Sequence, residues 1–335
     1  MNRFAYASPA TVTEAAAATG LVAEAMVTFD EGAVLKAGGI DLLDLLKSEL
    51  LAPSVVVNLR AIKGLDAITQ DAAGNLAIGA MASLSRVAEH PLVRGSYPAL
   101  AAAIAGAAGP QLRNVATLGG NLLQRPHCWY LRSPAHHCLR KGGGHCFAIR
   151  GENQYHAIFD NHACAIVHPS TAATALVALS AEVELHDAEG ATRRLPLEDF
   201  FVGPDDDIQR ENALRPREVL TAVRLRKPAS GTRMAHLRQG EKAGFDWPLA
   251  DVAVVLKLDP EGICRDASVV LGAAAPVPHR ARAAEEALQG RHLDEAAAGD
   301  AARAALRGAT PLSLNAYKLP LFETLVRRAI LAALG

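Results

Sequence analysis

Four of the five cysteines in this 335-residue chain fall within one stretch, residues 124–169, together with seven of the twelve histidines. Free cysteine is among the most buried residue types, so four unrelated buried thiols would be the simplest explanation. That explanation is weak, because the stretch is rich in Gly, Pro, His and Arg and has little apolar periodicity. The pattern predicts a long irregular loop whose cysteines serve a chemical purpose, as ligands of a bound group or as disulfide partners.

The spacing of the cysteines leaves three interpretations open. The four are Cys128, Cys138, Cys146 and Cys164, separated by 9, 7 and 17 residues. Thiolates bind iron–sulfur clusters or zinc, usually four at a time, whereas disulfides require an oxidising compartment. Structural zinc sites supply ligands as tight pairs and simple ferredoxins use tight runs, so this spacing identifies neither metal. An iron–sulfur cluster and zinc remain equally good interpretations, with disulfides third. Four basic side chains could offset the charge of a thiolate-ligated cluster: Arg125, Arg132, Arg140 and Lys141.

Length and charge bound the function. A chain of 335 residues can bury a sizeable core and is long enough for two or three domains. Its formal net charge is −1 and its sequence pI is about 6.9, which gives no electrostatic footprint for nucleic acid. No apolar run reaches the length of a membrane span, and the N-terminus lacks the apolar region of a secretory signal. We expect a cytoplasmic protein, or one exported to the periplasm with a signal-bearing partner subunit.

Two Gly-Gly pairs stand where the chain could bind phosphate. Residues 33–37 predict a strand that runs into Gly38-Gly39, and residues 40–50 predict a helix, so backbone N–H groups and the helix dipole would face an anion. The second pair, Gly119-Gly120, precedes Asn121, whose side chain can make local turn hydrogen bonds. Neither pair has the G-x-G-x-x-G pattern of a Rossmann site. The two loops could cradle the phosphates of one dinucleotide, although two ordinary turns are the simpler explanation.

The second half of the sequence reads as strands followed by helices. A hairpin is predicted over residues 182–195, and further strands over residues 219–225, 252–258 and 267–271. Helical segments follow, at residues 276–287, 294–307 and 315–334. Strands followed by helices indicate an α+β layer arrangement.

At GPQLRNVATLGGNLLQ, residues 109–124, the chain resembles the FAD-binding subunit of molybdenum hydroxylases of the xanthine oxidase family. Its second flavin motif matches at Gln111, Arg113, Asn114, Thr117, Gly119, Gly120 and Asn121. The first motif matches at Lys36, Ala37, Gly38, Gly39, Ile40, Asp41 and Leu42, with Ile40 where the family commonly has Thr. Further matches at residues 76–80, 168–181 and 271–276 extend the resemblance over essentially the whole chain.

One subgroup of that family carries a cysteine-bearing insertion after the second flavin motif. It includes the FAD subunit of bacterial periplasmic aldehyde oxidoreductase and, with different spacing, that of 4-hydroxybenzoyl-CoA reductase. Residues 128–130, 138–143 and 151–153 resemble the aldehyde oxidoreductase version most. The resemblance implies that the four cysteines Cys128, Cys138, Cys146 and Cys164 hold a [4Fe–4S] cluster and makes zinc a poorer interpretation.

The resemblance also implies a domain organisation. A two-subdomain FAD-binding domain of the vanillyl-alcohol-oxidase/PCMH type would span residues 1–185, with subdomains 1–60 and 61–185 and the cluster insertion at 124–168. A C-terminal domain like that of CO dehydrogenase flavoprotein, an antiparallel sheet plus helices, would span residues 186–335.

By resemblance, this chain passes electrons and has no catalytic side chain of its own. A substrate such as an aldehyde would be hydroxylated at the molybdenum cofactor of a large partner subunit. Electrons would cross two [2Fe–2S] clusters on a small partner subunit to the FAD here, and then pass to ferredoxin, a quinone or oxygen. The implied flavin contacts are the first-motif residues 36–42 with Thr117, Gly119, Gly120, Asn121, Ser170, Trp247 and Leu249.

Two departures from the family pattern affect the flavin site. Thr171 stands where the family often has an acidic residue, and residues 245–249 occupy the region where the xanthine dehydrogenase branch has a Lys. Two alternative functions remain. One is the FAD subunit of a 4-hydroxybenzoyl-CoA reductase-like or other molybdenum hydroxylase, and the other is a zinc-stapled, non-catalytic interaction subunit.

Overall fold

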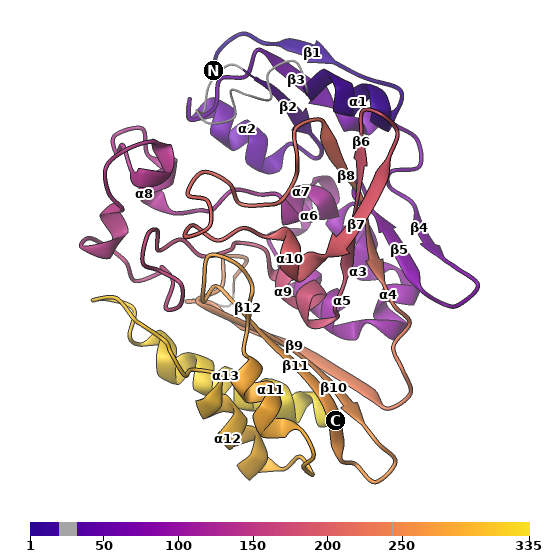
Figure 1. Ribbon diagram of the computed structural model, residues 1–335, viewed down its shortest axis with the longest axis vertical. Helices are drawn as coiled ribbons and strands as arrows, with labels where there is room; N and C mark the ends of the chain where they lie inside the picture. The colour runs from indigo at the N-terminus through magenta and orange to yellow at the C-terminus, as the bar shows by residue number, and fades with distance from the viewer. Residues whose placement is uncertain (20–31, 243) are drawn as a thin grey trace. The chain divides into compact units, whose positions relative to one another are not determined.

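The computed structural model describes residues 1–19, 32–242 and 244–335, and the chain divides into two compact units (Figure 1). The first unit is made of residues 1–87, 110–147 and 181–226, and the second of residues 88–109, 148–180 and 227–335. Each unit therefore draws on three separate stretches of sequence. The first unit has two sheets and the second has one, and each unit has its own hydrophobic core.

The first unit contains a small parallel sheet built from the N-terminal residues. Strands β1 (Ala5–Ala7) and β2 (Ala33–Lys36) lie on either side of β3 (Val55–Asn58). The β3 sequence VVVN suits this central place, because β-branched side chains favour extended backbone and pack well on a sheet. Val57 packs against α1 (Val12–Thr19) in the core. The sheet places the end of β2 and the glycine pair that follows it at the edge of a packed layer.

A second sheet in the first unit has five antiparallel strands. Across the sheet they are β4 (Ile68–Gln70), β5 (Leu76–Gly79), β8 (Glu218–Leu225), β6 (Glu182–Asp187) and β7 (Thr192–Pro196). β6, β7 and β8, which lie around and beyond the predicted boundary at residue 185, thus pair in one sheet with strands from the first hundred residues. The boundary itself stays a prediction.

Short helices connect these strands. Beside α1, those that lie wholly or mainly in the first unit are α2 (Ile40–Lys47), η2 (Leu59–Ala61), α3 (Leu84–Glu89), α6 (Pro110–Val115), α7 (Leu118–Leu122), α8 (Trp129–Arg132), η3 (Leu139–Lys141) and α10 (Leu197–Phe200). α2 begins directly after the first Gly-Gly pair, and α7 contains the second. α8 and η3 lie in the cysteine stretch, where the rest of the backbone is loop.

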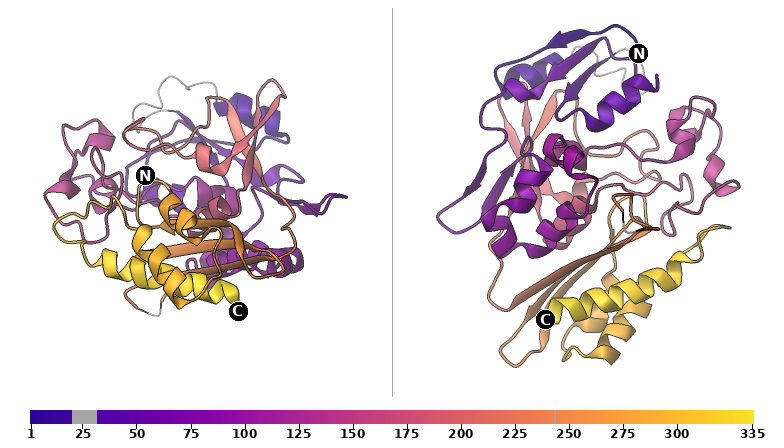
Figure 2. Two further views of the ribbon diagram at one scale, coloured as in Figure 1. Left: turned by 60° about the horizontal axis from the view of Figure 1, so that its bottom comes forward. Right: turned by 180° about the vertical axis from the view of Figure 1, so that it is seen from behind.

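The second unit is a sheet covered by helices on both faces. The strand order is β12 (His279–Arg280), β11 (Cys264–Gly272), β10 (Ala250–Leu258) and β9 (Thr232–Gln239), all antiparallel. Alternate residues of β10 and β11 form one core with the C-terminal helices, which lie against the long strands in Figure 2. Those helices are α11 (Arg282–Leu288), α12 (Glu295–Ala304) and α13 (Lys318–Leu334).

The opposite face of this sheet packs on α5 (Pro98–Ala105) and α9 (Thr171–Ala178). Every residue of α9 is buried, as expected for a helix of Ala, Thr, Leu and Val that has no polar face. A buried hydrogen bond joins α9 to β10, because Thr174 Oγ1 donates to Asp251 Oδ2 (2.8 Å). The remaining elements of the unit are α4 (Pro91–Ser96) and η4 (Phe147–Ile149), which begins at the last residue of the first unit.

These two units confirm the predicted α+β class, including an antiparallel sheet plus helices at the C-terminal end. No helix within residues 1–19, 32–242 and 244–335 is long and apolar enough to cross a membrane.

Candidate functional site

The first glycine pair forms an open helix start. β2 ends at Lys36, and Gly39, with φ +87°, is the N-cap of α2. A positive φ of this size is disfavoured for residues that carry a Cβ, which explains glycine here. Among the described residues no side chain caps this helix, so its first-turn N–H groups are left for another acceptor. Such a helix start can bind a phosphate.

The second glycine pair is held more tightly. Thr117 caps α7, accepting a hydrogen bond from the Gly120 N–H (3.1 Å), and the Gly119 N–H donates to the Ala80 carbonyl (2.8 Å). A Cβ on Gly119 would lie 2.8 Å from that of Ala80, so close packing requires glycine. Asn121 follows, with its own N–H bonded to the Thr117 carbonyl (2.8 Å).

The structure brings the two glycine loops together. A Cβ placed on Gly38 would lie 2.3 Å from the carbonyl oxygen of Val115, and one placed on Gly120 would lie 3.7 Å from the Cβ of Ala37. The backbones at Gly38 and Val115 are therefore in direct contact, with no room for a side chain. Two adjacent glycine loops are the arrangement that binding of one dinucleotide between them requires, so the residues present fit the diphosphate of FAD.

The other flavin candidates lie in the second unit. The Ser170 hydroxyl caps α9 by accepting from the Ala173 N–H (3.0 Å), and Thr171 Oγ1 donates to the Ala103 carbonyl (3.2 Å). Trp247 is 56% exposed, and the Leu249 N–H donates to the Gln239 carbonyl (2.8 Å). The hydroxyls of Ser170 and Thr171 thus hold the start of α9. Direct flavin contact by Ser170, Trp247 and Leu249 stays a prediction.

A tight turn brings Cys138 and Cys146 together. The Cys138 carbonyl accepts hydrogen bonds from the N–H groups of Lys141 (2.8 Å) and Gly143 (3.0 Å). The turn is closed when the Leu139 N–H donates to the His145 carbonyl (2.9 Å), one residue before Cys146. A Cβ on Gly143 would lie 1.8 Å from the carbonyl oxygen of His137, so only glycine allows this closure.

Aromatic packing brings Cys128 to the same place. The rings of Tyr130 and Phe147 stack with centroids 5.8 Å apart, and His145 packs on Phe147 at 4.3 Å. Tyr130 lies two residues after Cys128, and Phe147 directly follows Cys146. These contacts join the start of α8 to the far side of the cysteine turn, so three of the four predicted ligands lie in one loop.

The thiols of this loop interact with one another and with backbone N–H groups. Burial raises the pKa of Cys128 to about 11, backbone N–H groups of Leu131 and Tyr130 act to lower it, and Cys146 and Cys138 raise it further. N–H groups directed at a sulfur are typical of metal thiolates, whose potential they tune. A bound metal would remove the proton that burial retains.

The fourth predicted ligand, Cys164, lies in the second unit, where it is buried and one residue before Ala165, whose carbonyl accepts from the Ala157 N–H (2.9 Å). All five cysteines of the chain are thiols, so the structure contains no disulfide within the described residues. Within those residues, no group of three His, Cys, Asp or Glu side chains is arranged tightly enough to hold a metal ion. The assignment of Cys128, Cys138, Cys146 and Cys164 as ligands therefore stays a prediction.

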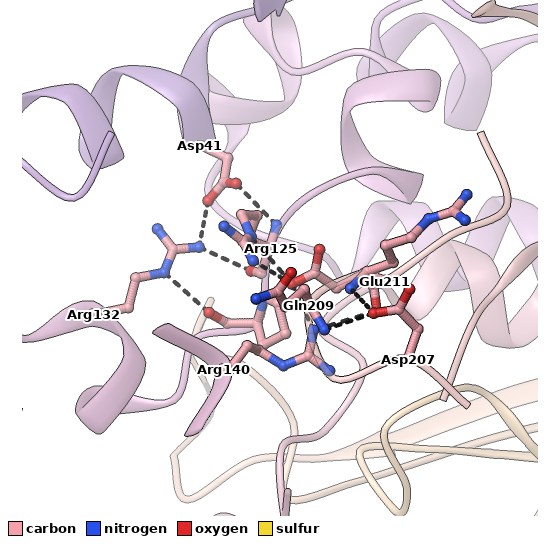
Figure 3. A network of polar contacts seen from close by, with 9 residues as sticks. Asp41, Arg125, Arg132, Arg140, Asp207, Gln209 and Glu211 are labelled. Carbon is pink, nitrogen blue, oxygen red and sulfur yellow. Dashed lines mark hydrogen bonds and ion pairs between the residues drawn. The ribbon is translucent and has the colours of Figure 1, made fainter. Parts of the chain in front are cut away.

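Asp41 links the cysteine insertion to the helix α2 (Figure 3). Its Oδ2 accepts from the Arg125 N–H (2.9 Å), and its Oδ1 accepts from Arg132 Nη2 (2.6 Å). Arg132 also donates to the carbonyls of Pro126 (3.0 Å) and Arg125 (2.8 Å). Nearby, burial and then Arg132 lower the pKa of His127 to about 4, so its imidazole is neutral at pH 7. The carboxylate of a predicted flavin residue is thus used to anchor the insertion.

Glu211 is a second anchor, and no sequence motif marks it. Its Oε1 accepts from Arg125 Nη2 (2.7 Å) and from Arg140 Nη1 (3.0 Å), as Figure 3 shows. The Glu211 carbonyl accepts from the Val202 N–H (3.1 Å), and Asp207 Oδ1 accepts from the Gln209 N–H (2.9 Å). These two hydrogen bonds fix the loop at residues 202–211 that carries Glu211. Sequence analysis missed Glu211 because its partners lie 71 and 86 residues away.

A buried histidine predicts acid sensitivity. Burial lowers the pKa of His168 from its ordinary 6.5 to about 3. The Ser170 N–H donates to His168 Nδ1 (3.4 Å), which requires that nitrogen to be unprotonated. Below pH 6.5 the imidazole of His168 binds a proton in the unfolded chain but not in the folded chain. The free energy of unfolding therefore falls as pH drops from 6.5 toward 3.

We expect this histidine to remove about 2 kcal/mol from the free energy of unfolding at pH 5 relative to pH 7, measured by urea unfolding. His168→Asn, which keeps an acceptor for the Ser170 N–H, should reduce the pH dependence by that amount. The matched change His162→Asn, at an exposed side chain in the same insertion, should leave it unaltered. An equal pH dependence in wild type and His168→Asn would show that His168 is not responsible.

Comparison with known proteins identifies the family. The model of the FAD binding domain in molybdopterin dehydrogenase matches residues 2–228, and that of the CO dehydrogenase flavoprotein C-terminal domain matches residues 235–333. The first match alone covers more than half of the chain. The chain therefore belongs to the FAD-binding subunits of the molybdenum hydroxylases.

Individual relatives agree with this family. The aldehyde oxidoreductase FAD-binding subunit PaoB of Escherichia coli (strain K12) is 37% identical over 259 residues, which are 77% of this chain and 79% of PaoB. Among solved structures, carbon monoxide dehydrogenase from Hydrogenophaga pseudoflava has a TM-score of 0.77 at 27% identity, covering 99% of this chain and 97% of that one. Quinoline 2-oxidoreductase from Pseudomonas putida 86 has a TM-score of 0.74 at 26% identity, covering 99% and 96%.

The predicted family, fold class and role as an oxidoreductase subunit are confirmed by these comparisons, and FAD binding is supported. The individual flavin contacts, the cluster on this chain and the domain boundary at residue 185 stay predictions.

Proposed function

We propose that this chain is the FAD- and [4Fe–4S]-containing electron-transfer subunit of a heterotrimeric, molybdenum-dependent aldehyde oxidoreductase. The observation that carries the proposal is the loop that gathers Cys128, Cys138 and Cys146 directly after the second flavin motif. The 37% identity to an aldehyde oxidoreductase FAD-binding subunit supports the substrate class. Cys164 is the fourth ligand by resemblance.

In this proposal the chain has two partners. A large subunit holds the molybdenum cofactor, and a small subunit holds two [2Fe–2S] clusters that deliver electrons to this chain. Bound FAD supplies redox chemistry that accepts and releases electrons, which leave for ferredoxin, a quinone or oxygen. The assembly is cytoplasmic, or periplasmic if a signal-bearing partner carries this chain through export.

The side chains and backbone of this chain bind and tune its cofactors. The first-turn N–H groups of α2 and the loops at residues 36–42 and 117–121 would hold the diphosphate, and the close approach of Gly38 to Val115 keeps the two loops together. Ser170, Trp247 and Leu249 would lie toward the ribityl chain and flavin ring. Lys141, whose ammonium donates to the Ser133 carbonyl (2.6 Å), would offset cluster charge.

Metal and flavin analysis of the purified complex tests this function. We expect iron and acid-labile sulfide on this chain in the ratio of one [4Fe–4S] cluster per FAD, with flavin bands over a broad iron–sulfur absorbance. Cys138→Ser should abolish the electron paramagnetic resonance signal of the reduced cluster and leave those of the [2Fe–2S] clusters. Stoichiometric zinc in place of iron would contradict the cluster, and absence of flavin would leave only an interaction subunit.

A further inference from the structure

Asp41 belongs to both candidate cofactor sites. It is the second residue of α2, whose open N-terminus follows the Gly38-Gly39 pair, and both of its carboxylate oxygens accept hydrogen bonds from the cysteine insertion. Its side chain is 19% exposed, so the insertion covers most of it. A carboxylate at this place in a diphosphate-binding helix requires an explanation.

A free carboxylate here would oppose flavin binding in two ways. An ionised Asp in the first turn interacts favourably with the same helix dipole that attracts a phosphate, so the two anions compete for one helix end. The like charges also repel at short range, and more strongly in a partly buried site than in water. Arg132 and the Arg125 N–H remove both effects, because they hold the Asp41 oxygens and neutralise the charge.

The capture of Asp41 depends on an ordered insertion. Arg132 lies on α8, which begins directly after Cys128, and donates through all three guanidinium nitrogens. Arg125 is fixed from the other side by Glu211, which also holds buried Arg140. Among the described residues, Arg140 Nε and Nη2 have no hydrogen-bond partner, so Glu211 is the carboxylate that keeps this buried cation in place. Loss of order in the cysteine turn would therefore loosen the grip on Asp41.

We propose that Asp41 couples the two sites, so that an ordered cysteine loop sequesters its carboxylate and thereby raises the affinity of the glycine loops for FAD. This inference rests on the proposed function, since it assumes that the cysteine loop is ordered by a bound cluster. Asp41 does not react itself, and its effect depends on whether Arg132 and Arg125 hold its carboxylate. Loss of the cluster is therefore expected to release the Asp41 carboxylate, and the released charge weakens FAD binding.

The test compares the effect of Cys138→Ser in two backgrounds. The FAD dissociation constant is measured by flavin fluorescence on the deflavinated, assembled complex. In the presence of Asp41 we expect Cys138→Ser to raise that constant at least about tenfold, or about 1.4 kcal/mol. In the Asp41→Asn background, where no charge is released, we expect the same change to raise it less than about threefold.

Asp44→Asn is the matched control. Asp44 also accepts from Arg132 (3.1 Å), but its side chain is 64% exposed and lies a turn further along α2. In this background the effect of Cys138→Ser should stay at the wild-type level. Equal effects in the Asp41 and Asp41→Asn backgrounds, or suppression by Asp44→Asn as well, would overturn the inference.

The failure of the inference can be separated from that of the proposed function. Iron in the wild-type complex that does not exceed the iron of the two [2Fe–2S] clusters on the small subunit contradicts the [4Fe–4S] cluster itself, and this is measured before any variant is made. Unchanged FAD affinity in an iron-depleted Cys138→Ser complex overturns only the coupling through Asp41.

Discussion

Replacing Gly143 with alanine is expected to prevent the cysteine loop from binding the proposed cluster. The added Cβ would lie 1.8 Å from the carbonyl oxygen of His137 and 3.0 Å from that of Cys138, and backbone atoms cannot turn aside as a side chain can. Overpacking of this kind costs about 1–3 kcal/mol or more, and relief requires the Cys138 backbone to move. We expect the iron bound by this chain, beyond that of the [2Fe–2S] clusters of the small subunit, to fall at least about tenfold.

Gly144→Ala is the matched control. Among the described residues no atom lies within 4 Å of a Cβ at Gly144, so this change should leave iron content, measured on the same preparation, at the wild-type level. Full iron occupancy in Gly143→Ala would show that the turn does not position Cys138 for binding. Equal loss in both variants would point to general fragility of the loop.

Replacing Gly38 with alanine is expected to remove FAD. The new Cβ would lie 2.3 Å from the carbonyl oxygen of Val115 and 3.1 Å from the Cα of Ala116, so the two glycine loops would have to separate. Because the proposed diphosphate site lies between these loops, their separation breaks the alignment of the N–H groups that bind it. We expect the FAD content per chain, measured by release and fluorescence, to fall at least about tenfold.

The control for this change is Gly95→Ala. Gly95 lies in α4, where no described atom lies within 4 Å of an added Cβ, and alanine favours a helix over glycine. Its FAD content should equal that of the wild type. Retention of stoichiometric FAD by Gly38→Ala, in protein with an unchanged circular dichroism spectrum, would contradict the placement of the flavin at these loops.

Local patterns in the sequence predicted the parts of the site that depend on neighbouring residues. Gly38-Gly39 before a helix, and Gly119-Gly120 before Asn121, are recognisable because backbone conformation depends on residue types a few positions apart. The long loop of the cysteine stretch was predicted in the same way, from its lack of apolar periodicity. The α+β class followed from the order of strands and helices.

Contacts between distant segments could not be predicted in this way. Asp41 meets Arg125 and Arg132 across 84 and 91 residues, and Glu211 meets Arg140 across 71. Such pairs are set by how packed layers bring loops together, and no local propensity encodes them. The spacing of the cysteines likewise gave no sign that the Leu139–His145 hydrogen bond would close the turn.

The interleaving of the two units constrains how the protein is made. Residues 88–109 and 148–180 leave the ribosome before residue 227, yet the strands β9, β10 and β11 on which α5 and α9 pack come after it. A nascent chain tends to fold domain by domain from its N-terminus, but here apolar α9 must wait for more than fifty further residues. During translation α9 is therefore synthesised before the strands that bury it. At that stage its apolar surface is exposed, and binding by a chaperone or an early-docking partner subunit would shield that surface from aggregation.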